Sequence, residues 1–329
     1  MRYLLRRITG GVVVLTIVSA VVFGLFYILP ADPARLACGK SCTPELMAKI
    51  RHTLEIDQPI VVQYERFIKG IFVGRDYNKG TTAQIHCPAP CLGYSYQTDE
   101  PVTALIKDRL PATLSIAAGA SILWLLIGVA SGIISALKRG TWIDKFAQGI
   151  ALGGASLQIY FVGLVLQFIF VDKLGWLHSP GYVSPLDDPR EWFNEMLLPW
   201  ITLAFLLSAI YARLTRAGML EIMSEDYIRT ARAKGLSKRT INFKHVLRAA
   251  ITPIVTVFGL DLGQLLGGAV ITEYVFNIPG LGRLSTDAVS NVDLPVIIGT
   301  VMFAAFFIVT ANIVVDLLYA RLDPKVRLK

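Results

Sequence analysis

The sequence carries little charge for its length. Only 17% of its 329 residues are Asp, Glu, Lys or Arg, whereas soluble domains contain about 25%, and its mean hydropathy is +0.55. HExxH and GxSxG motifs are absent and the four histidines are scattered, so the sequence offers no constellation for metalloprotease or serine-hydrolase chemistry. We therefore expect a membrane protein that is not an enzyme and has no cofactor or metal site of its own.

The few charged residues lie between long apolar runs and almost never inside them. Charge-free runs cover residues 8–29, 110–137, 146–171, 196–212 and 294–315, and a further run, 249–272, contains only Asp261. A spanning helix needs roughly 20 apolar residues, so the pattern predicts an all-α membrane protein with six transmembrane helices. The first run has 22 residues, more than the 7 to 15 of a signal peptide, and we expect it to be retained.

The distribution of Lys and Arg predicts the orientation of these helices, because short cytoplasmic segments are enriched in both. With a cytoplasmic N-terminus, 19 of the 32 Lys and Arg residues fall in inside segments and three in the two short outside loops. The other ten lie in residues 31–109, a segment too long to influence orientation. We therefore expect both termini and the basic stretch 227–253 in the cytoplasm, and residues 31–108 outside.

All four cysteines lie in this outside segment, as Cys38 and Cys42 in CGKSC and as Cys87 and Cys91 in CPAPC. The outside of a cytoplasmic membrane is oxidising, so we expect disulfide bonds. Bonds that join the two motifs are favoured, because longer loops constrain the unfolded chain more. A four-thiolate metal site is the alternative, since the spacing is close to that of zinc ligands.

Three carboxylates lie within or at the edge of apolar runs: Asp261, Glu273 and Asp316. A carboxylate deep in a membrane normally faces a bundle interior or an aqueous path. Asp261 and the nearby Gln264 are therefore candidates for a translocation path, and a hydrogen bond between helices is the alternative. Glu273 and Asp316 lie near the ends of predicted spans, and we expect them at the interface.

The cytoplasmic stretch has the signals of a short helix at about 224–236. Ser224 is a candidate N-cap, and Glu225 and Asp226 in the first turn suit the positive end of the helix dipole. Ile228 and Ala231, with Leu236, form a modest apolar side, and Gly235 is a natural C-terminal stop.

A second helix is predicted to follow, capped by Ser237 and leading into the next span. A short exposed helix with small residues fits a groove on a partner protein. The alternatives are a solvated loop that only sets topology, and a nucleic-acid surface. We do not favour nucleic acid, because the charge distribution already explains the basic residues and few aromatic residues are interleaved with them.

The segment YIRTARAKG, residues 227–235, resembles the cytoplasmic loop of the permease subunits of ATP-binding cassette importers. The general family pattern is E-A-A-x-x-x-G; here Arg229 stands in the place of the glutamate, and Thr230 and Ala231 stand in the places of the alanines. The segment matches the variant found in the peptide-import branch of that family. Four further segments resemble the same branch: RLPATL (109–114), IDQPIVVQY (56–64), LLGGAVITEYVFNIPGLGRL (265–284) and VDLLYARLDPKVR (315–327).

The chain is thus similar to the B-type permeases of the dipeptide and oligopeptide (peptide/nickel) importers. The resemblance implies a type I importer permease fold in the plasma membrane of a prokaryote. It divides the chain into a first helix (1–30), an outside segment (31–108), a permease core (109–322) and a cytoplasmic tail (323–329). The implied partners are a second permease subunit, two ATPase subunits that bind ATP and Mg, an extracytoplasmic binding protein, its peptide substrate and membrane lipid.

The resemblance also implies where these partners bind. The ATPase would dock on Glu225, Tyr227, Ile228, Arg229, Thr230, Ala231, Arg232, Ala233, Lys234, Gly235 and Leu236. The binding protein would contact the disulfide-bearing segment and the loop Pro279, Gly280, Leu281, Gly282 and Arg283. Import of nickel or another small solute by the same machinery is an alternative. An ion-coupled secondary transporter is disfavoured, since only one carboxylate lies well inside a predicted span.

Overall fold

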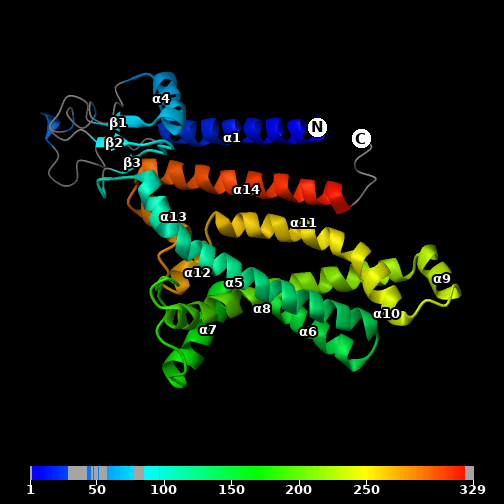
Figure 1. The fold of residues 1–329 in the computed structure, drawn as a ribbon. Coiled ribbons are helices and arrows are strands. Elements are labelled where there is room, and N and C mark those ends of the chain that lie inside the picture. Colours follow the sequence, from blue (N-terminus) through cyan, green and yellow to red (C-terminus); the bar gives the residue numbers. More distant parts are fainter. Residues whose placement is uncertain are drawn as a thin grey trace.

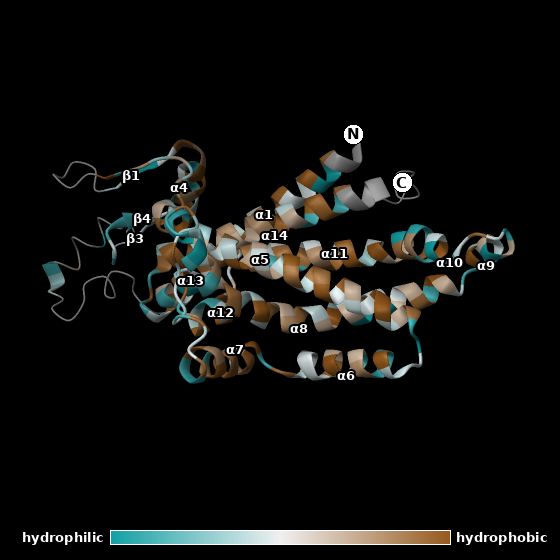
Figure 2. Ribbon diagram, turned by 60° about the horizontal axis from the view of Figure 1, so that its bottom comes forward, coloured by the Kyte–Doolittle hydropathy of each residue, from teal (hydrophilic) through white to brown (hydrophobic). Residues whose placement is uncertain are grey.

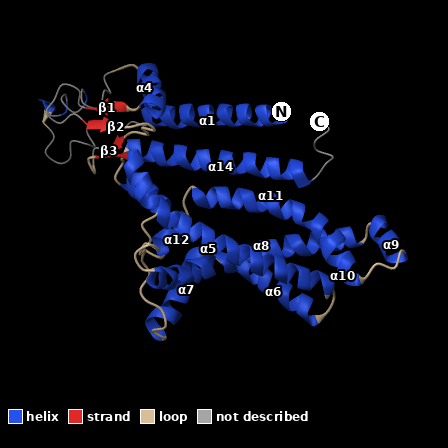
Figure 3. Cartoon of the chain, in the orientation of Figure 1, coloured by secondary structure: helices blue, strands red, loops and turns tan. Residues whose placement is uncertain are grey.

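A computed structural model of the chain describes residues 2–28, 43–45, 47, 51, 58–77, 85–95 and 97–322. Most of this part of the chain is helical (Figure 3). The helices are α1 (Arg2–Ile28), α4 (Ile60–Val73), α5 (Val102–Leu137), α6 (Trp142–Ser156), α7 (Ile159–Gln167), α8 (Pro189–Met223), α9 (Asp226–Ala233), α10 (Lys238–Thr240), α11 (Leu247–Leu266), α12 (Val270–Val275), α13 (Leu281–Ser290) and α14 (Leu294–Leu322). Two π-helices, η2 (Phe168–Lys173) and η3 (Ile241–Val246), and four short strands, β1 (Arg75–Tyr77), β2 (Ile85–Cys87), β3 (Tyr94–Ser95) and β4 (Glu100–Pro101), complete the list.

The long helices pack along one another, α5 against α8 and α14 against both α1 and α11 (Figure 1). Small residues permit the closest of these contacts. A Cβ atom on Gly128 of α5 would lie 2.6 Å from the Cβ of Tyr211, and one on Gly132 would lie 2.6 Å from the Cβ of Thr215. This GxxxG spacing lets helix backbones approach closely, as is common between membrane helices.

The elements divide between two ends of the helix bundle. The start of α1, the end of α14, and α9 with α10 lie at one end, whereas α4, the strands and α13 lie at the other (Figure 1). Figure 2 shows hydrophobic residues along the long helices and hydrophilic residues on α9 and α10. The basic stretch 227–253 therefore begins at the same end of the molecule as the first residues of α1.

The third predicted span is not one straight helix. Five helices are long and apolar enough to cross a membrane, and α6 with α7 and η2 makes a sixth only as a pair bent by 100°. Leu157 and Gln158 at the break are extended, with ψ of 149° and 144°. The span predicted over 146–171 therefore stays a prediction: the apolar run is helical on both sides of a sharp bend, and absence of charge gives the length of such a run and not its direction.

The predicted span 249–272 is wrong at its end. The helix that begins at Lys238 runs without interruption to Leu266, and α12 follows as a separate element after two glycines. Gly268 has φ +126°, a conformation that residues with a Cβ rarely adopt. The turn at Gly267 and Gly268 therefore ends the helix inside the apolar run.

The strands at the other end form two antiparallel pairs, β1 with β2 and β3 with β4. Arg75 pairs with Cys87 in the first of them, and Cys87 forms a disulfide with Cys91. The expectation that disulfides join the two cysteine motifs is therefore wrong for CPAPC, whose two cysteines pair with each other. The bond closes a turn next to the β1–β2 pair. Cys38 and Cys42 lie outside the described residues.

Candidate functional site

The candidate docking helix is α9, which lies between α8 and α10 at one extremity of the molecule (Figure 1). Its start differs from the prediction. Ser224 is the C-cap of α8 and its hydroxyl donates to the carbonyl of Glu221 at 2.6 Å, and the N-cap of α9 is Glu225 in an extended conformation. Ser224 does not cap α9, because α8 continues as a helix as far as Met223.

The end of α9 agrees with the prediction. Gly235 has φ +74°. Its amide donates to the carbonyl of Arg232 at 3.0 Å, and the amide of Leu236 donates to the carbonyl of Ala231 at 3.3 Å. These two bonds form a Schellman motif, in which a left-handed residue reverses the chain and satisfies the last helix carbonyls. The hydroxyl of Ser237 then accepts from the amide of Thr240 at 3.2 Å, which confirms the second cap.

Two residues hold α9 on the bundle. Ile228 is completely buried and Ala231 is 9% exposed, and they form one cluster with Ala136, Met219, Ile241, Val246 and Ala250. These five residues come from α5, α8, η3 and α11, so α9 contacts several parts of the bundle at once. Leu236 was expected on the same apolar side, but it is 41% exposed, because the chain turns away after Gly235.

The remaining candidate docking residues form the outer surface of α9. Those exposed are Glu225, Tyr227, Arg229, Thr230, Arg232, Ala233, Lys234, Gly235 and Leu236. Although about half of Tyr227 is exposed, partial desolvation raises the pKa of its hydroxyl, and the nearby Glu225 carboxylate raises this pKa further. Arg229 lies 3.3 Å from Asp226 one turn earlier, and both side chains are mostly exposed. The surface thus presents aromatic, small and mainly basic side chains around a rigid core of two buried residues.

A buried ion pair lies at the same end of the bundle and was not found from the sequence. Asp144 of α6 accepts from Nε and Nη2 of Arg216 on α8 at 2.8 and 3.0 Å. The same carboxylate accepts from the hydroxyl of Ser135, the amide of Gly140 and the side chain of Gln148. Its side chain is only 3% exposed. Asp144 and Arg216 are 72 positions apart, so no local pattern in the sequence indicates that they pair. The Lys and Arg residues of these segments were used only to predict the orientation of the helices in the membrane.

The two path candidates lie on α11 in different surroundings. Asp261 accepts from the hydroxyl of Tyr211 on α8 at 2.8 Å, so the expected hydrogen bond between helices exists, with Tyr211 as the partner. The ring of Tyr211 packs on the buried indole of Trp124, with centroids 6.3 Å apart. Gln264 is exposed. The structure thus places Asp261 in a polar contact between α5, α8 and α11.

The candidate binding-protein loop lies at the opposite end from α9. Gly280, Leu281 and Gly282 are buried, whereas Arg283 is partly exposed. Pro279 is also partly exposed. Glu273 was expected at the interface, but it is 0% exposed and lies beneath this loop. Asp316, the other carboxylate expected at the interface, is partly exposed and lies 2.8 Å from Arg7 of α1.

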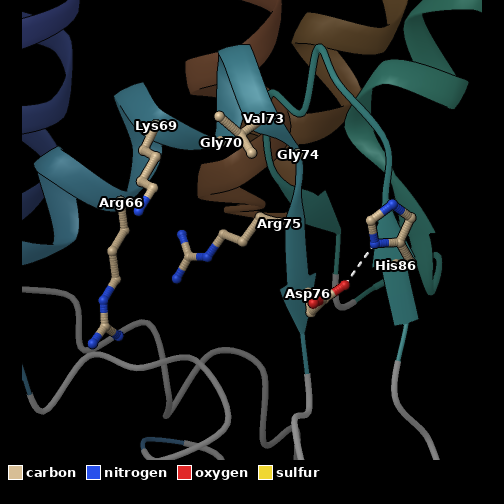
Figure 4. A pocket seen from close by; sticks show the side chains of 8 residues that line it. All are labelled: Arg66, Lys69, Gly70, Val73, Gly74, Arg75, Asp76 and His86. Atoms are coloured by element: carbon tan, nitrogen blue, oxygen red, sulfur yellow. Dashed lines mark hydrogen bonds and ion pairs between the residues drawn. The ribbon is translucent and has the colours of Figure 1, made fainter.

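A basic cavity lies close to the disulfide. It has a volume of about 480 Å³ and is lined by Arg66, Lys69, Gly70, Val73, Gly74, Arg75, Asp76 and His86. Figure 4 shows Arg66 and Lys69 extending from α4 toward the same side as Arg75. Nδ1 of His86 lies 2.6 Å from Asp76 and links β1 to β2. No group of three or more His, Cys, Asp or Glu residues that could hold a metal is present in the described ranges.

Two parts of the chain match families of transport proteins. Residues 1–117 match the N-terminal family of binding-protein-dependent transport system membrane components, and residues 128–328 match the binding-protein-dependent transport system inner membrane component family. The class is thus the multi-pass inner membrane permease of an ABC importer. The second match covers more than half of the chain, and the chain belongs to this family.

Relatives of full length narrow the assignment. A putative peptide transport system permease protein of Brucella abortus is 37% identical over 324 residues, with 98% of each chain covered. The glutathione transport system permease protein GsiC of Salmonella paratyphi A is 37% identical over 329 residues, with both chains fully covered. The chain is therefore an ABC importer permease of the peptide family, the branch that the segment 227–235 indicates.

One solved structure supports the fold. Inward-facing MetNI, a methionine ABC transporter, contains a chain that is 16% identical to this one, with a TM-score of 0.52. The likeness covers 67% of this chain and 97% of that chain. It shows a common fold for two thirds of the sequence.

Proposed function

We propose that the chain is the transmembrane subunit of an ATP-driven importer for short peptides delivered by an extracytoplasmic binding protein. The observation that carries the proposal is the construction of α9, which is held by Ile228 and Ala231 and exposes the rest of its candidate docking residues. A helix that only set topology would not need a buried attachment to α5, α8 and α11. A helix that receives force from a partner would need one.

In this proposal two separate ATPase subunits bind ATP and Mg, and this chain does not hydrolyse ATP. ATP binding closes the ATPases, which pull on the exposed surface of α9. Because Ile228 and Ala231 share one core with α5, α8, η3 and α11, displacement of α9 is passed directly to these helices. The ends of the path then open and close alternately.

The path itself would lie between this chain and a second permease subunit. Peptide is the proposed substrate, because relatives covering the whole chain are described as peptide and glutathione permeases. Asp261 is the proposed path residue, since its carboxylate can attract the ammonium group of a peptide inside the bundle. The exposed side chain of Gln264 lies on the same helix, one turn further on.

The binding protein is proposed to dock at the end opposite α9. Arg283 is the partly exposed charged residue of the candidate loop, and the disulfide-bearing segment lies at the same end of the molecule (Figure 1). The buried Gly280, Leu281 and Gly282 would hold the loop in place. The orientation that this requires, with α9 in the cytoplasm, follows from the Lys and Arg distribution.

The proposal is tested by reconstitution. The chain is purified with its second permease and ATPase subunits in lipid nanodiscs, and ATP hydrolysis is measured with and without peptide-loaded binding protein. We expect the loaded binding protein to stimulate hydrolysis, and proteoliposomes to accumulate labelled peptide only with ATP. Equal accumulation with a non-hydrolysable ATP analogue, or accumulation driven by an ion gradient alone, would contradict the proposal.

A further inference from the structure

A carboxylate without any exposed surface lies where α12 meets α13. Glu273 is 0% exposed. Its Oε1 accepts from the hydroxyl of Thr113 at 2.8 Å and from the amide of Ala269 at 3.2 Å, and its Oε2 accepts from the amide of Arg283 at 2.9 Å. All three partners are donors, and both carboxyl oxygens of Glu273 accept. A buried carboxylate with these bonds cannot be released from them without a large desolvation cost.

Thr113 extends this network from α5 to the start of α13. Its hydroxyl accepts from the amide of Leu281 at 2.9 Å while it donates to Glu273. The first amides of a helix have no partner inside the helix, and the N-cap of α13 is Gly280, which has no side chain to supply one. Thr113 and Glu273 therefore cap α13 from two other elements.

The surrounding glycines show how closely this junction is packed. A Cβ on Gly280 would lie 2.3 Å from the carboxyl carbon of Glu273, and a Cβ on Gly282 would lie 2.6 Å from the Cα of Val270. Leu281 is buried in one cluster with Val102, Leu105, Ile106 and Val296 of α5 and α14. The start of α13 thus has little space to shift while these contacts remain.

We infer that Glu273 and Thr113 are positioning residues that fasten α13 to α5, so that α5, α12 and α13 move as one unit at the end of the path opposite α9. This inference rests on the proposed function. Helix α5 also contributes Ala136 to the core beneath α9, and the same helix carries Thr113. In this arrangement a movement that begins at α9 is passed along α5 to α13 as long as the hydrogen bonds of Glu273 hold.

The test compares variants of the assembled complex by hydrogen exchange and by transport. Glu273→Gln places an amide group against backbone donors, and Thr113→Val removes the hydroxyl with little change of shape. We expect exchange of the amides of residues 281–285 to become about tenfold faster or more in both variants, with unchanged exchange in α9. The ATP hydrolysed per peptide transported should rise, because α13 no longer follows α5.

Two matched variants complete the design. Thr113→Ser keeps the hydroxyl and should retain slow exchange and coupling. Ser290→Ala changes an exposed side chain at the other end of α13 and should have no effect on either measurement. If the complex with Glu273→Gln does not assemble, the result for Thr113→Val alone tests the inference.

Three outcomes would overturn the inference: unchanged exchange at 281–285, faster exchange throughout the chain, or unchanged coupling. Failure of the proposed function would look different. In that case the wild-type complex itself shows no ATP-dependent peptide uptake, whereas the exchange at α13, measured without nucleotide, still reports on the cap.

Discussion

Asp144 and Arg216 join the start of α6 to α8 through two hydrogen bonds of 2.8 and 3.0 Å, at the end of the bundle that carries α9. The Asp144 side chain is almost completely buried and the Arg216 side chain is 22% exposed. Ser135 from α5 also donates to this carboxylate, so three helices meet at one charge. The pair therefore fixes the relative positions of α5, α6 and α8 immediately before the chain enters α9.

Loss of this pair should destabilise the subunit. Asp144→Asn leaves Arg216 without a counter-charge, and we expect the unfolding temperature of the complex to fall, because one member of a buried ion pair is then uncompensated. Arg216→Lys keeps the charge but loses the two-pronged contact, so its effect should be smaller. Thermal unfolding of the purified complex in detergent measures both, with the exposed Glu191→Gln as control. If the double variant Asp144→Asn, Arg216→Lys loses the full sum of the two single effects, the two residues act independently.

The conformation of Gly235 should be necessary for coupling. A Cβ at this position would meet nothing within 4 Å, so the effect of a substitution comes from the backbone, whose φ is +74°, and from contact with a partner. Gly235→Asp should leave membrane insertion intact and lower transport per ATP by about tenfold, because it places a carboxylate on the surface where the ATPase is proposed to dock.

The control for Gly235 isolates the charge. Asn is similar in size to Asp and, like Asp, tolerates the left-handed region, but it carries no charge. Gly235→Asn should retain more coupling than Gly235→Asp. Full transport by Gly235→Asp, measured with the same amount of subunit in the membrane, would rule out α9 as the docking element.

Reversal of the charge at Arg229 should weaken docking of the ATPase without affecting the fold. The side chain is 71% exposed, and its pair with Asp226 is also exposed, so the pair contributes little to stability. Arg229→Glu restores the residue type of the general family pattern, but it also places like charges one turn apart on α9. We expect slower association with the ATPase, and a smaller difference from wild type at high salt.

Binding of the ATPase to the subunit in nanodiscs, measured by interferometry at two salt concentrations, tests this prediction. Arg229→Gln removes the charge without reversing it. Its rate of association with the ATPase should lie between those of the wild type and Arg229→Glu. Tighter binding by Arg229→Glu would mean that the partner presents a basic surface at this point, as the general family pattern suggests.

The sequence predicted those features that depend on neighbouring residues. Apolar runs located the long helices, and Gly235 and Ser237 were recognised because each acts on amides or carbonyls within five positions of itself. Ser224 was assigned to the wrong helix, since a serine between two helices can close one or open the other. Ser224 caps the end of α8 because α8 continues as far as Met223, and the length of α8 is not readable from the residues around Ser224.

The features that were missed depend on residues far apart in the chain. Glu273 and Thr113 are separated by 160 positions, so a carboxylate at the edge of an apolar run could not be distinguished from an interfacial one. The bend between α6 and α7 was missed because no charged residue lies at the break, Leu157 and Gln158. A buried polar group in a membrane bundle is identified by its partners, and these are brought together only by the fold.

Stability at the end opposite α9 should depend on pH through Asp293. This carboxylate is 7% exposed and accepts from the hydroxyl of Ser95, which joins β3 to the start of α14. Burial raises its pKa above the ordinary value of 3.8, although hydrogen bonds from Ser95 and the amide of Val296 oppose the shift. The folded state therefore binds the proton more tightly than the unfolded state.

The sign of the effect follows from this difference. The contribution is fully present below pH 3.8 and is lost as the pH rises through the raised pKa of the folded state. Asp293→Asn has no charge to titrate, so its unfolding temperature should vary less over this range than that of the wild type. Equal pH dependence of the two proteins would exclude Asp293 as the titrating group.

Removal of the Cys87–Cys91 disulfide should weaken docking of the binding protein more than it weakens the fold. The two cysteines are four positions apart, and closing so small a loop stabilises by roughly 2 kcal/mol in the chain-entropy estimate. Both sulfurs pack in a small cluster with Tyr77 and Tyr94, remote from α9. In Cys87→Ala, Cys91→Ala we expect the β1–β2 pair to loosen and the affinity for the binding protein to fall severalfold, while ATPase binding is unchanged. The exposed Thr98→Ala is the control on the same surface. Unchanged affinity for the binding protein would place its docking surface on Arg283 and its neighbours alone.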